Sequence, residues 1–194
     1  MPRSRWLTIF GGALILGGAA SLAWYYSIHH ASTRAQQGAQ VWLDRTLAAH
    51  PAVSNALTPP VRLKRGDVVG RLAIPRLNLS VMVFEGDGPA ILKRGAGHIP
   101  GTSLPHEAGN CAIAAHRDTF FRPLRLIRSH DLVEFTTPEG VFRYIITDTE
   151  IVPPSEIDVL ARAPGRNLTL VTCYPFYYLG SAPKRFIVHA ELIS

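Results

Sequence analysis

The chain has 194 residues, 47% of them hydrophobic, and carries a net charge of +6 with an isoelectric point near 9.7. This apolar content excludes a wholly disordered chain, and the length accommodates one domain of ordinary size beyond an N-terminal segment. The positive residues are scattered, without a dense Lys/Arg block or interleaved aromatic residues. We therefore expect no nucleic-acid partner.

The first segment is an uncharged run, Trp6–Ile28, that is long enough to cross a bilayer as a helix. Arg3 and Arg5 precede it, and the first positive residue beyond it is Arg34. The positive-inside rule then places the N-terminus in the cytoplasm and the rest of the chain outside. We expect a single-pass protein of the cell membrane with its main domain on the extracytoplasmic side.

A cleaved signal peptide is the alternative, because Ser21-Leu22-Ala23 resembles a small-x-small cleavage site. A retained anchor is favoured because the uncharged run continues past that site. Both interpretations export the domain. We divide the chain into 1–30, membrane anchor or signal peptide; 31–65, helical stalk and linker; and 66–194, the main domain.

The stalk segment shows apolar residues at roughly helical spacing, namely Ala35, Ala39, Trp42, Leu43 and Leu47. This pattern predicts a helix over 31–50, either free-standing or packed on the domain. The prolines between His50-Pro51 and Pro59-Pro60 then predict a linker.

The remainder is mostly β. Apolar, β-rich runs predict strands over 68–77, 79–85, 110–116, 131–137, 141–152, 167–174 and 185–193, with a short extended piece within 95–104. Pro75 indicates an edge or a bulge, and Pro138-Glu139-Gly140 a hairpin with a three-residue turn. Short helical segments are expected within 88–94, 120–128 and 153–163. About eight strands with few helices predict a closed or nearly closed barrel.

The two cysteines, Cys111 and Cys173, allow two exclusive interpretations. An exported protein could pair them in a disulfide, whereas thiol chemistry requires them free. Cys111 lies in a run of small apolar residues and is expected to be a buried, inert thiol. Neither cysteine has the spacing of a zinc site, so we expect no metal and no cofactor.

Three residues that end or begin strands carry the chemistry of acyl transfer: Cys173, His116 and Arg185. A thiolate attacks a carbonyl, an imidazole transfers protons, and a guanidinium stabilises an oxyanion. Thr172 would orient the thiol or the substrate. Taken singly, each of these residues is more often structural, and the hypothesis depends on all of them together.

These residues stand in motifs that resemble those of the sortases. Thr169-Leu170-Val171-Thr172-Cys173 is similar to the TLxTC signature, Ala115-His116-Arg117-Asp118 to the histidine motif, and Lys184-Arg185-Phe186 to the arginine that follows the cysteine. The sequence around His116 and Cys173 is most similar to that of the class D sortases. The resemblance covers roughly residues 66–194; Ala115 departs from it, since the family usually has glycine there.

The resemblance implies an eight-stranded sortase-type β-barrel in which Cys173 is the nucleophile, His116 the general acid/base and Arg185 the oxyanion or substrate stabiliser. It implies cleavage of an LPxT-like sorting motif in a partner protein and transfer of the acyl group to an amine of the cell envelope. Two alternatives stay open: a cysteine peptidase that hydrolyses the same bond, and a non-catalytic cell-envelope binding domain.

Overall fold

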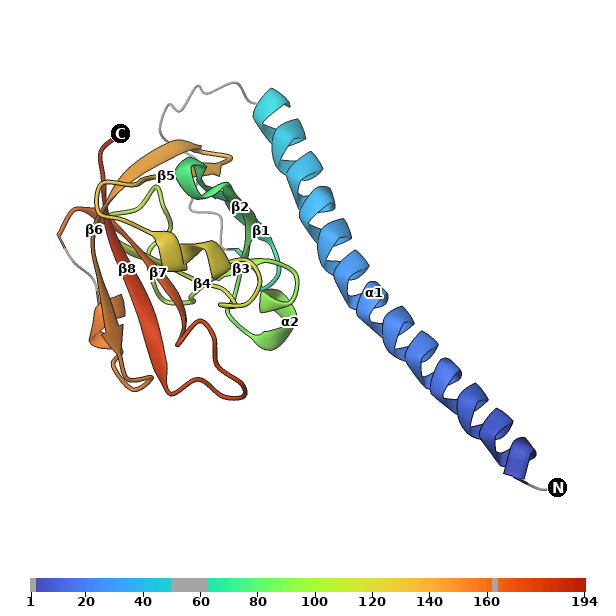
Figure 1. Ribbon diagram of the computed structural model, residues 1–194. Helices are drawn as coiled ribbons and strands as arrows, with labels where there is room; N and C mark the ends of the chain where they lie inside the picture. The colour runs from blue at the N-terminus through green and yellow to red at the C-terminus, as the bar shows by residue number, and fades with distance from the viewer. Residues whose placement is uncertain (1–2, 50–62, 162–163) are drawn as a thin grey trace.

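The computed structural model describes residues 3–49, 63–161 and 164–194. The chain forms one long helix followed by a β-rich body (Figure 1). The helical elements are α1 (Arg3–Ala49), α2 (Pro89–Leu92) and the 3-10 turns η1 (Pro75–Leu77), η2 (Arg122–Leu126) and η3 (Asp158–Leu160). The strands are β1 (Val68–Ile74), β2 (Leu79–Glu85), β3 (Ala96–His98), β4 (Gly109–Ala114), β5 (Leu132–Thr137), β6 (Gly140–Val152), β7 (Arg166–Tyr174) and β8 (Lys184–Leu192).

The strands close into a barrel in the order β1-β2-β3-β4-β7-β8-β6-β5. Two neighbouring pairs are parallel, β2 with β3 and β4 with β7, and the others are antiparallel. Closure leaves no unpaired strand edge. The eight-stranded, mostly β architecture expected from the sequence is therefore confirmed.

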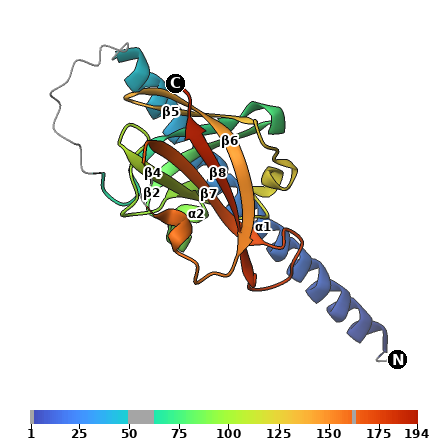
Figure 2. The same cartoon turned by 90° about the vertical axis from the view of Figure 1, so that its left-hand side faces the viewer.

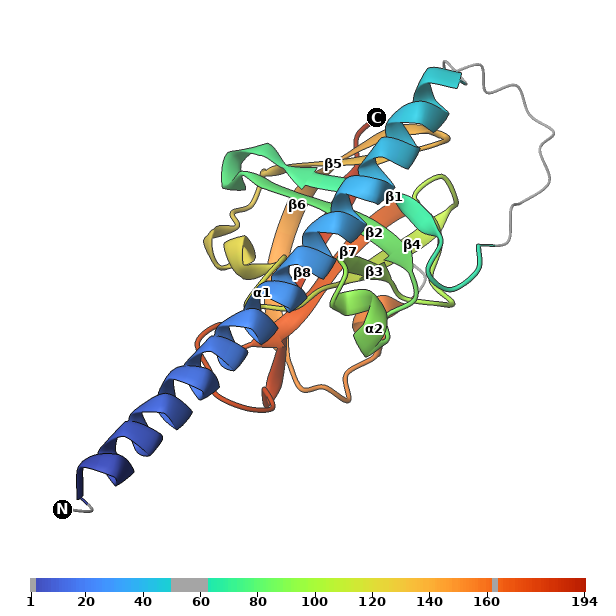
Figure 3. The ribbon, with the colours of Figure 1, turned by 90° about the vertical axis from the view of Figure 1, so that its right-hand side faces the viewer.

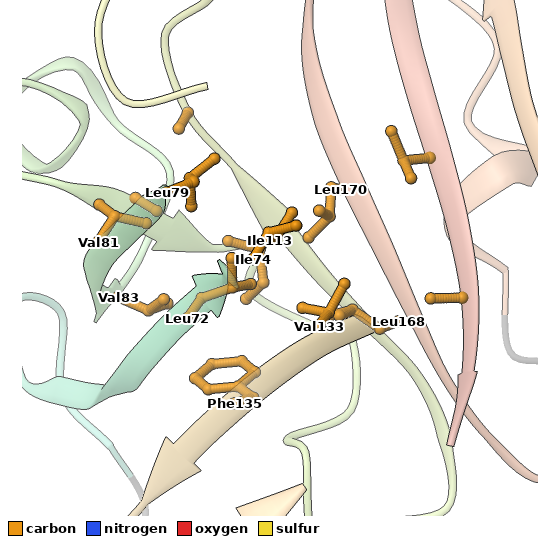
Figure 4. Close-up of a cluster of buried hydrophobic side chains, with 14 of the residues drawn as sticks. Leu72, Ile74, Leu79, Val81, Val83, Ile113, Val133, Phe135, Leu168 and Leu170 are labelled. Atoms are coloured by element: carbon orange, nitrogen blue, oxygen red, sulfur yellow. The ribbon is translucent and has the colours of Figure 1, made fainter. Parts of the chain in front are cut away.

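Strand alternation fills the interior of the barrel. Along β7, Leu168 and Leu170 are fully buried in the core cluster, whereas Thr169, Val171 and Cys173 belong to the opposite face. The core residues converge from strands on all sides of the barrel (Figure 4). Burying one such leucine or phenylalanine contributes about 1.5–3 kcal/mol, so this packing fixes the strand ends that carry the candidate site.

Two local predictions are wrong in detail. The first strand ends at Ile74, because Pro75 opens the 3-10 turn η1 instead of sitting in a strand edge or bulge. The hairpin between β5 and β6 has two loop residues, Pro138 and Glu139, since Gly140 already pairs with Thr137. Gly140 adopts φ +147°, a conformation that a residue with a side chain rarely takes.

The C-terminal part of α1 packs against the barrel, so the packed-helix alternative for this segment is confirmed. Leu43 is fully buried in a small cluster with Met82, Phe84 and Ile91. The amide of Gln36 donates to the Arg94 carbonyl at 2.6 Å and accepts from the Met82 N–H at 2.8 Å. The helix therefore crosses the outside of the barrel over β1 and β2 (Figure 3).

The N-terminal part of α1 extends beyond the barrel, and its described apolar side chains are exposed, among them Phe10, Leu14, Ile15, Leu16 and Leu22. Among the described residues, no helix meets the length and hydropathy that a membrane crossing needs. The helix is continuous across the expected boundary at residue 30. The expected linker, from His50 to Pro60, lies outside the described residues.

Replacing Leu43 by alanine is expected to release α1 from the barrel. A buried Leu→Ala change typically costs about 2–5 kcal/mol, and Leu43 is the only fully buried leucine among the described residues of α1. Hydrogen exchange of residues 36–47 would measure the release. Val41→Ala is the matched control, because Val41 lies on the same helix and is 48% exposed. Equal exchange in both variants would mean that the helix is held by other contacts.

Candidate active site

The order of three neighbouring strands brings the candidate residues together. β7 lies between β4 and β8, and Cys173 is the residue before the last of β7. Cys173 is paired directly with Arg185 of β8. Partners opposite one another in a sheet share a face, and neighbouring strands lie about 4.8 Å apart. The thiol and the guanidinium therefore start from adjacent positions on the outer face of the barrel.

His116 reaches the same end from the other side of β7. β4 and β7 run parallel with Ala114 opposite Val171, and the Ala115 N–H extends this ladder by donating to the Val171 carbonyl at 3.2 Å. If the register of β4 and β7 continues for two more residues, His116 lies opposite Cys173. His116 is exposed and Cys173 half-buried, so both are within reach of a molecule that approaches this end of the barrel.

Thr172 is placed differently from the three candidate residues. It is 2% exposed, and its hydroxyl donates to the Ala115 carbonyl at 2.7 Å. Since neighbouring strand residues point to opposite faces, Thr172 and Cys173 face opposite ways. The hydroxyl thus joins the end of β7 to the residue before His116 and faces away from the thiol.

An aromatic cluster holds the strand ends beneath the site. The Phe176 and Phe186 rings meet edge to face with centroids 5.3 Å apart, and Tyr174 contacts both of them. Phe176 and Phe186 also pack on the barrel core. Arg185 donates to the carbonyls of Lys184 at 3.1 Å and Ala182 at 3.4 Å. These bonds are long and reach only residues close in sequence. The Arg185 guanidinium can therefore exchange them for hydrogen bonds to another partner.

The two cysteines are both free, so the disulfide alternative is wrong. Cys111 lies on the core face of β4 and is 1% exposed. Burial raises the pKa of the Cys111 thiol far above its ordinary value, and the nearby charges of Glu85 and Glu107 add to the effect. A thiol held protonated at neutral pH is not a nucleophile. The prediction that Cys111 is buried is confirmed.

The imidazole of His98 is buried, and both of its ring nitrogens have hydrogen-bond partners. Its Nδ1 lies 2.7 Å from Glu85, and its Nε2 contacts the Thr102 hydroxyl at 3.0 Å and the Ser103 carbonyl at 3.1 Å. These contacts tie β3 to the loop before β4. His98 is therefore part of the scaffold.

A cavity of about 570 Å³ opens on the same outer face. Asn110 and Thr169 of β4 and β7 contribute to its floor, while Glu156 and Asp158 come from the β6–β7 loop. Thr169 lies on the face of Cys173, about 13 Å along the strand. None of the three candidate residues lines the cavity. Among the described residues, no group of His, Cys, Asp and Glu side chains is arranged to hold a metal ion.

The comparison with known families agrees with this geometry. The sortase domain matches residues 72–193, which include every strand from β2 to β8 and the three candidate residues. This chain belongs to the sortase family. The resemblance to the sortases is thereby confirmed.

Individual relatives support the assignment. Sortase D of Bacillus subtilis (strain 168) is 33% identical over 130 residues, 66% of this chain and 66% of that protein. Sortase A of Streptococcus agalactiae is 33% identical over 134 residues, 64% of this chain and 53% of that protein. The alignments with this sortase thus span between about half and two thirds of the length of these relatives.

Solved sortase structures have the same barrel. Clostridium perfringens sortase C, determined with the C-terminal cell wall sorting motif, superposes with a TM-score of 0.64 at 28% identity over 73% of this chain and 78% of that one. A Clostridium perfringens Sortase D5 transpeptidase superposes with a TM-score of 0.68 at 24% identity, covering 85% and 99% of the two chains. The second comparison shows the shared fold alone.

Sequence reasoning identified the three residues but not what holds them in place. The bond from Thr172 to the Ala115 carbonyl and the contacts of Arg117 depend on which strands are neighbours. Arg117 follows His116 directly, and its guanidinium contacts the β7–β8 loop. Its place in the histidine motif was the only signal that could have singled it out among the arginines.

Proposed function

We propose that this protein is a sortase-type cysteine transpeptidase that cleaves an LPxT-like motif and transfers the acyl group to an amine of the cell envelope. The proposal rests on family membership and on one geometric observation. In the barrel, Cys173 is the central member of a row formed with Arg185 on one side and the extension of β4 toward His116 on the other. Nucleophile, acid/base and anion stabiliser are the groups that acyl transfer requires.

In the first half-reaction the Cys173 thiolate attacks the backbone carbonyl carbon of the threonine in the motif. The C–S bond forms, and negative charge moves to the carbonyl oxygen, where Arg185 stabilises it. The C–N bond then breaks as His116 in its protonated form gives its proton to the leaving amine. The products are a thioester on Cys173 and the released C-terminal peptide.

In the second half-reaction an amine attacks the thioester carbonyl. His116 takes the proton that the amine loses, the C–S bond breaks, and the thiolate is regenerated. Water in place of the amine would give hydrolysis, the peptidase alternative. A non-catalytic domain would need Cys173 buried or paired, whereas Cys173 is free and half-buried.

We further propose that the N-terminal helix holds the enzyme at the extracytoplasmic face of the cell membrane. Its support is the uncharged run Trp6–Ile28 with arginines only on its N-terminal side. The exposed apolar side chains of Phe10, Leu14 and Leu22 are consistent with a lipid environment. Its partners would be proteins with a C-terminal sorting signal and the envelope amine that accepts them.

The deciding experiment incubates the full chain in detergent with a library of LPxT-like peptides, with and without a nucleophilic amine. We expect a peptide–amine conjugate in mass spectra, formed through an adduct on Cys173. Products that contain only the free acid, at every amine concentration, would favour the peptidase. Absence of any Cys173 adduct with every peptide would reject the enzyme.

A further inference from the structure

The β7–β8 loop, residues 175–183, connects Cys173 to Arg185, and one side chain from outside the loop holds its tip. Arg117 donates through Nη2 to the carbonyls of Tyr178 at 2.7 Å and Gly180 at 3.1 Å. Its guanidinium carbon also lies 5.9 Å from the centre of the Tyr178 ring. We infer that Arg117 is a positioning residue for the reaction, an inference that rests on the acyl-transfer function proposed above. Arg117 holds this loop against the histidine segment. The thiol, the imidazole and the Arg185 guanidinium thereby keep their relative positions.

The tip of the loop has little else to hold it. Tyr177 is 73% exposed and Leu179 98% exposed. In the described part of the chain, no other hydrogen bond reaches residues 177–181. The beginning of the loop is anchored differently, because Phe176 packs with Tyr174 and Phe186. Loss of Arg117 would therefore free the tip while leaving the end of β7 packed.

The position of Arg117 in the chain makes this contact relevant to the site. It follows His116 directly, and the Phe121 N–H closes the same turn by donating to the His116 carbonyl at 3.0 Å. The loop that Arg117 grips leads into Arg185, whose guanidinium contacts the Ala182 carbonyl of that loop. One guanidinium thus connects the histidine turn to the segment between the nucleophile and the second arginine.

The second terminal nitrogen of the Arg117 guanidinium is enclosed by the protein. Nη1 is buried and has no hydrogen-bond partner among the described residues. A buried donor without a partner is rare and costly, and native structures keep such groups at special positions. Hydrogen bonds from a charged group are stronger than those between neutral groups. The bonds to the two loop carbonyls are therefore maintained against the cost of the unpaired nitrogen.

The test compares the full-length Arg117→Ala and Arg117→Lys variants with Arg122→Ala, a control that removes an exposed arginine of the neighbouring turn η2. We expect Arg117→Ala to lower kcat for peptide–amine conjugation about 10- to 100-fold with a smaller change in KM, because misplaced groups slow the chemistry more than binding. Arg117→Lys should recover part of the rate, since lysine keeps the charge but not the planar fork. Arg122→Ala should match the wild type.

Hydrogen exchange of residues 176–183 provides a readout that does not depend on activity. Arg117→Ala should exchange faster there, with unchanged protection of β4 and β7. Unchanged loop exchange, or a conjugation rate within twofold of the wild type, would overturn the inference. A rate loss that simply follows the unfolded fraction would also overturn it, because the effect would then be on folding. If the loop exchanges faster in Arg117→Ala but the wild type never forms a Cys173 adduct, the proposed function is rejected. The contact by which Arg117 holds the loop would still stand.

Discussion

Replacing Cys173 by alanine is expected to abolish cleavage of any sorting peptide and the covalent adduct that precedes it. No other described side chain at this end of the barrel offers a thiol, and loss of a nucleophile in a comparable covalent mechanism costs on the order of 10⁶ in kcat. The variant should fold as the wild type does, because Cys173 is half-buried and makes no disulfide. Mass spectrometry of the protein after incubation with peptide measures the adduct directly.

Cys111→Ser is the matched control for the same chemistry at the other thiol. It should keep the acylation rate while lowering stability by about 1–3 kcal/mol, because a hydroxyl is placed in an apolar core. Alkylation of the native protein should modify Cys173 and spare Cys111, whose thiol is enclosed and whose pKa burial raises. Equal loss of acylation in both single variants would contradict the assignment of Cys173 as the sole nucleophile.

Arg185→Ala is expected to slow formation of the acyl-enzyme by about 10²–10³, or roughly 3–4 kcal/mol in the barrier. Peptide binding should weaken far less, because the guanidinium gains its main partner when charge develops on the carbonyl oxygen. Arg185→Lys should restore only part of the rate, since an ammonium lacks the planar pair of donors. The time course of the Cys173 adduct by rapid-quench mass spectrometry separates this step from binding.

Arg166→Ala is a suitable control for Arg185, because Arg166 is an exposed arginine that starts β7 at the opposite end of the strand from the site. It removes the same charge from the chain and should leave acylation unchanged. Near-normal adduct formation in Arg185→Ala would remove Arg185 from the mechanism. An equal slowing in Arg166→Ala would point to net charge instead of a specific contact.

The sequence was sufficient for the local structure and for a hypothesis about the chemistry of the site. Apolar, β-rich runs located β4, β7 and β8, and the strand that carries Cys173 ends at Tyr174 as expected. The motif residues could be assigned roles because each residue type has few chemical uses at a strand end. Errors were confined to places where one residue decides the geometry, as at Pro75 and Gly140.

The arrangement in space could not be predicted from the same patterns. The parallel pairing of β4 with β7 joins segments 57 residues apart in sequence, and no local signal specifies it. The bonds of Thr172 and Arg117 depend on that pairing and were out of reach for the same reason. The packing of α1 was left open because Gln36, a polar residue at the contact, gives no hydrophobic signal for its bonds to the barrel backbone.

The loop between β7 and β8 lies at the end of the barrel nearer the N-terminus of α1, away from the C-terminus of the chain (Figures 1 and 2). From residue 28 to Gln36, whose side chain bonds to the barrel backbone, the helix rises about 12 Å. In a chain held in a bilayer by its uncharged run, this short rigid spacer sets the working height of the enzyme. With the anchoring proposed above, partner proteins would be selected by how far above the membrane each one presents its scissile bond.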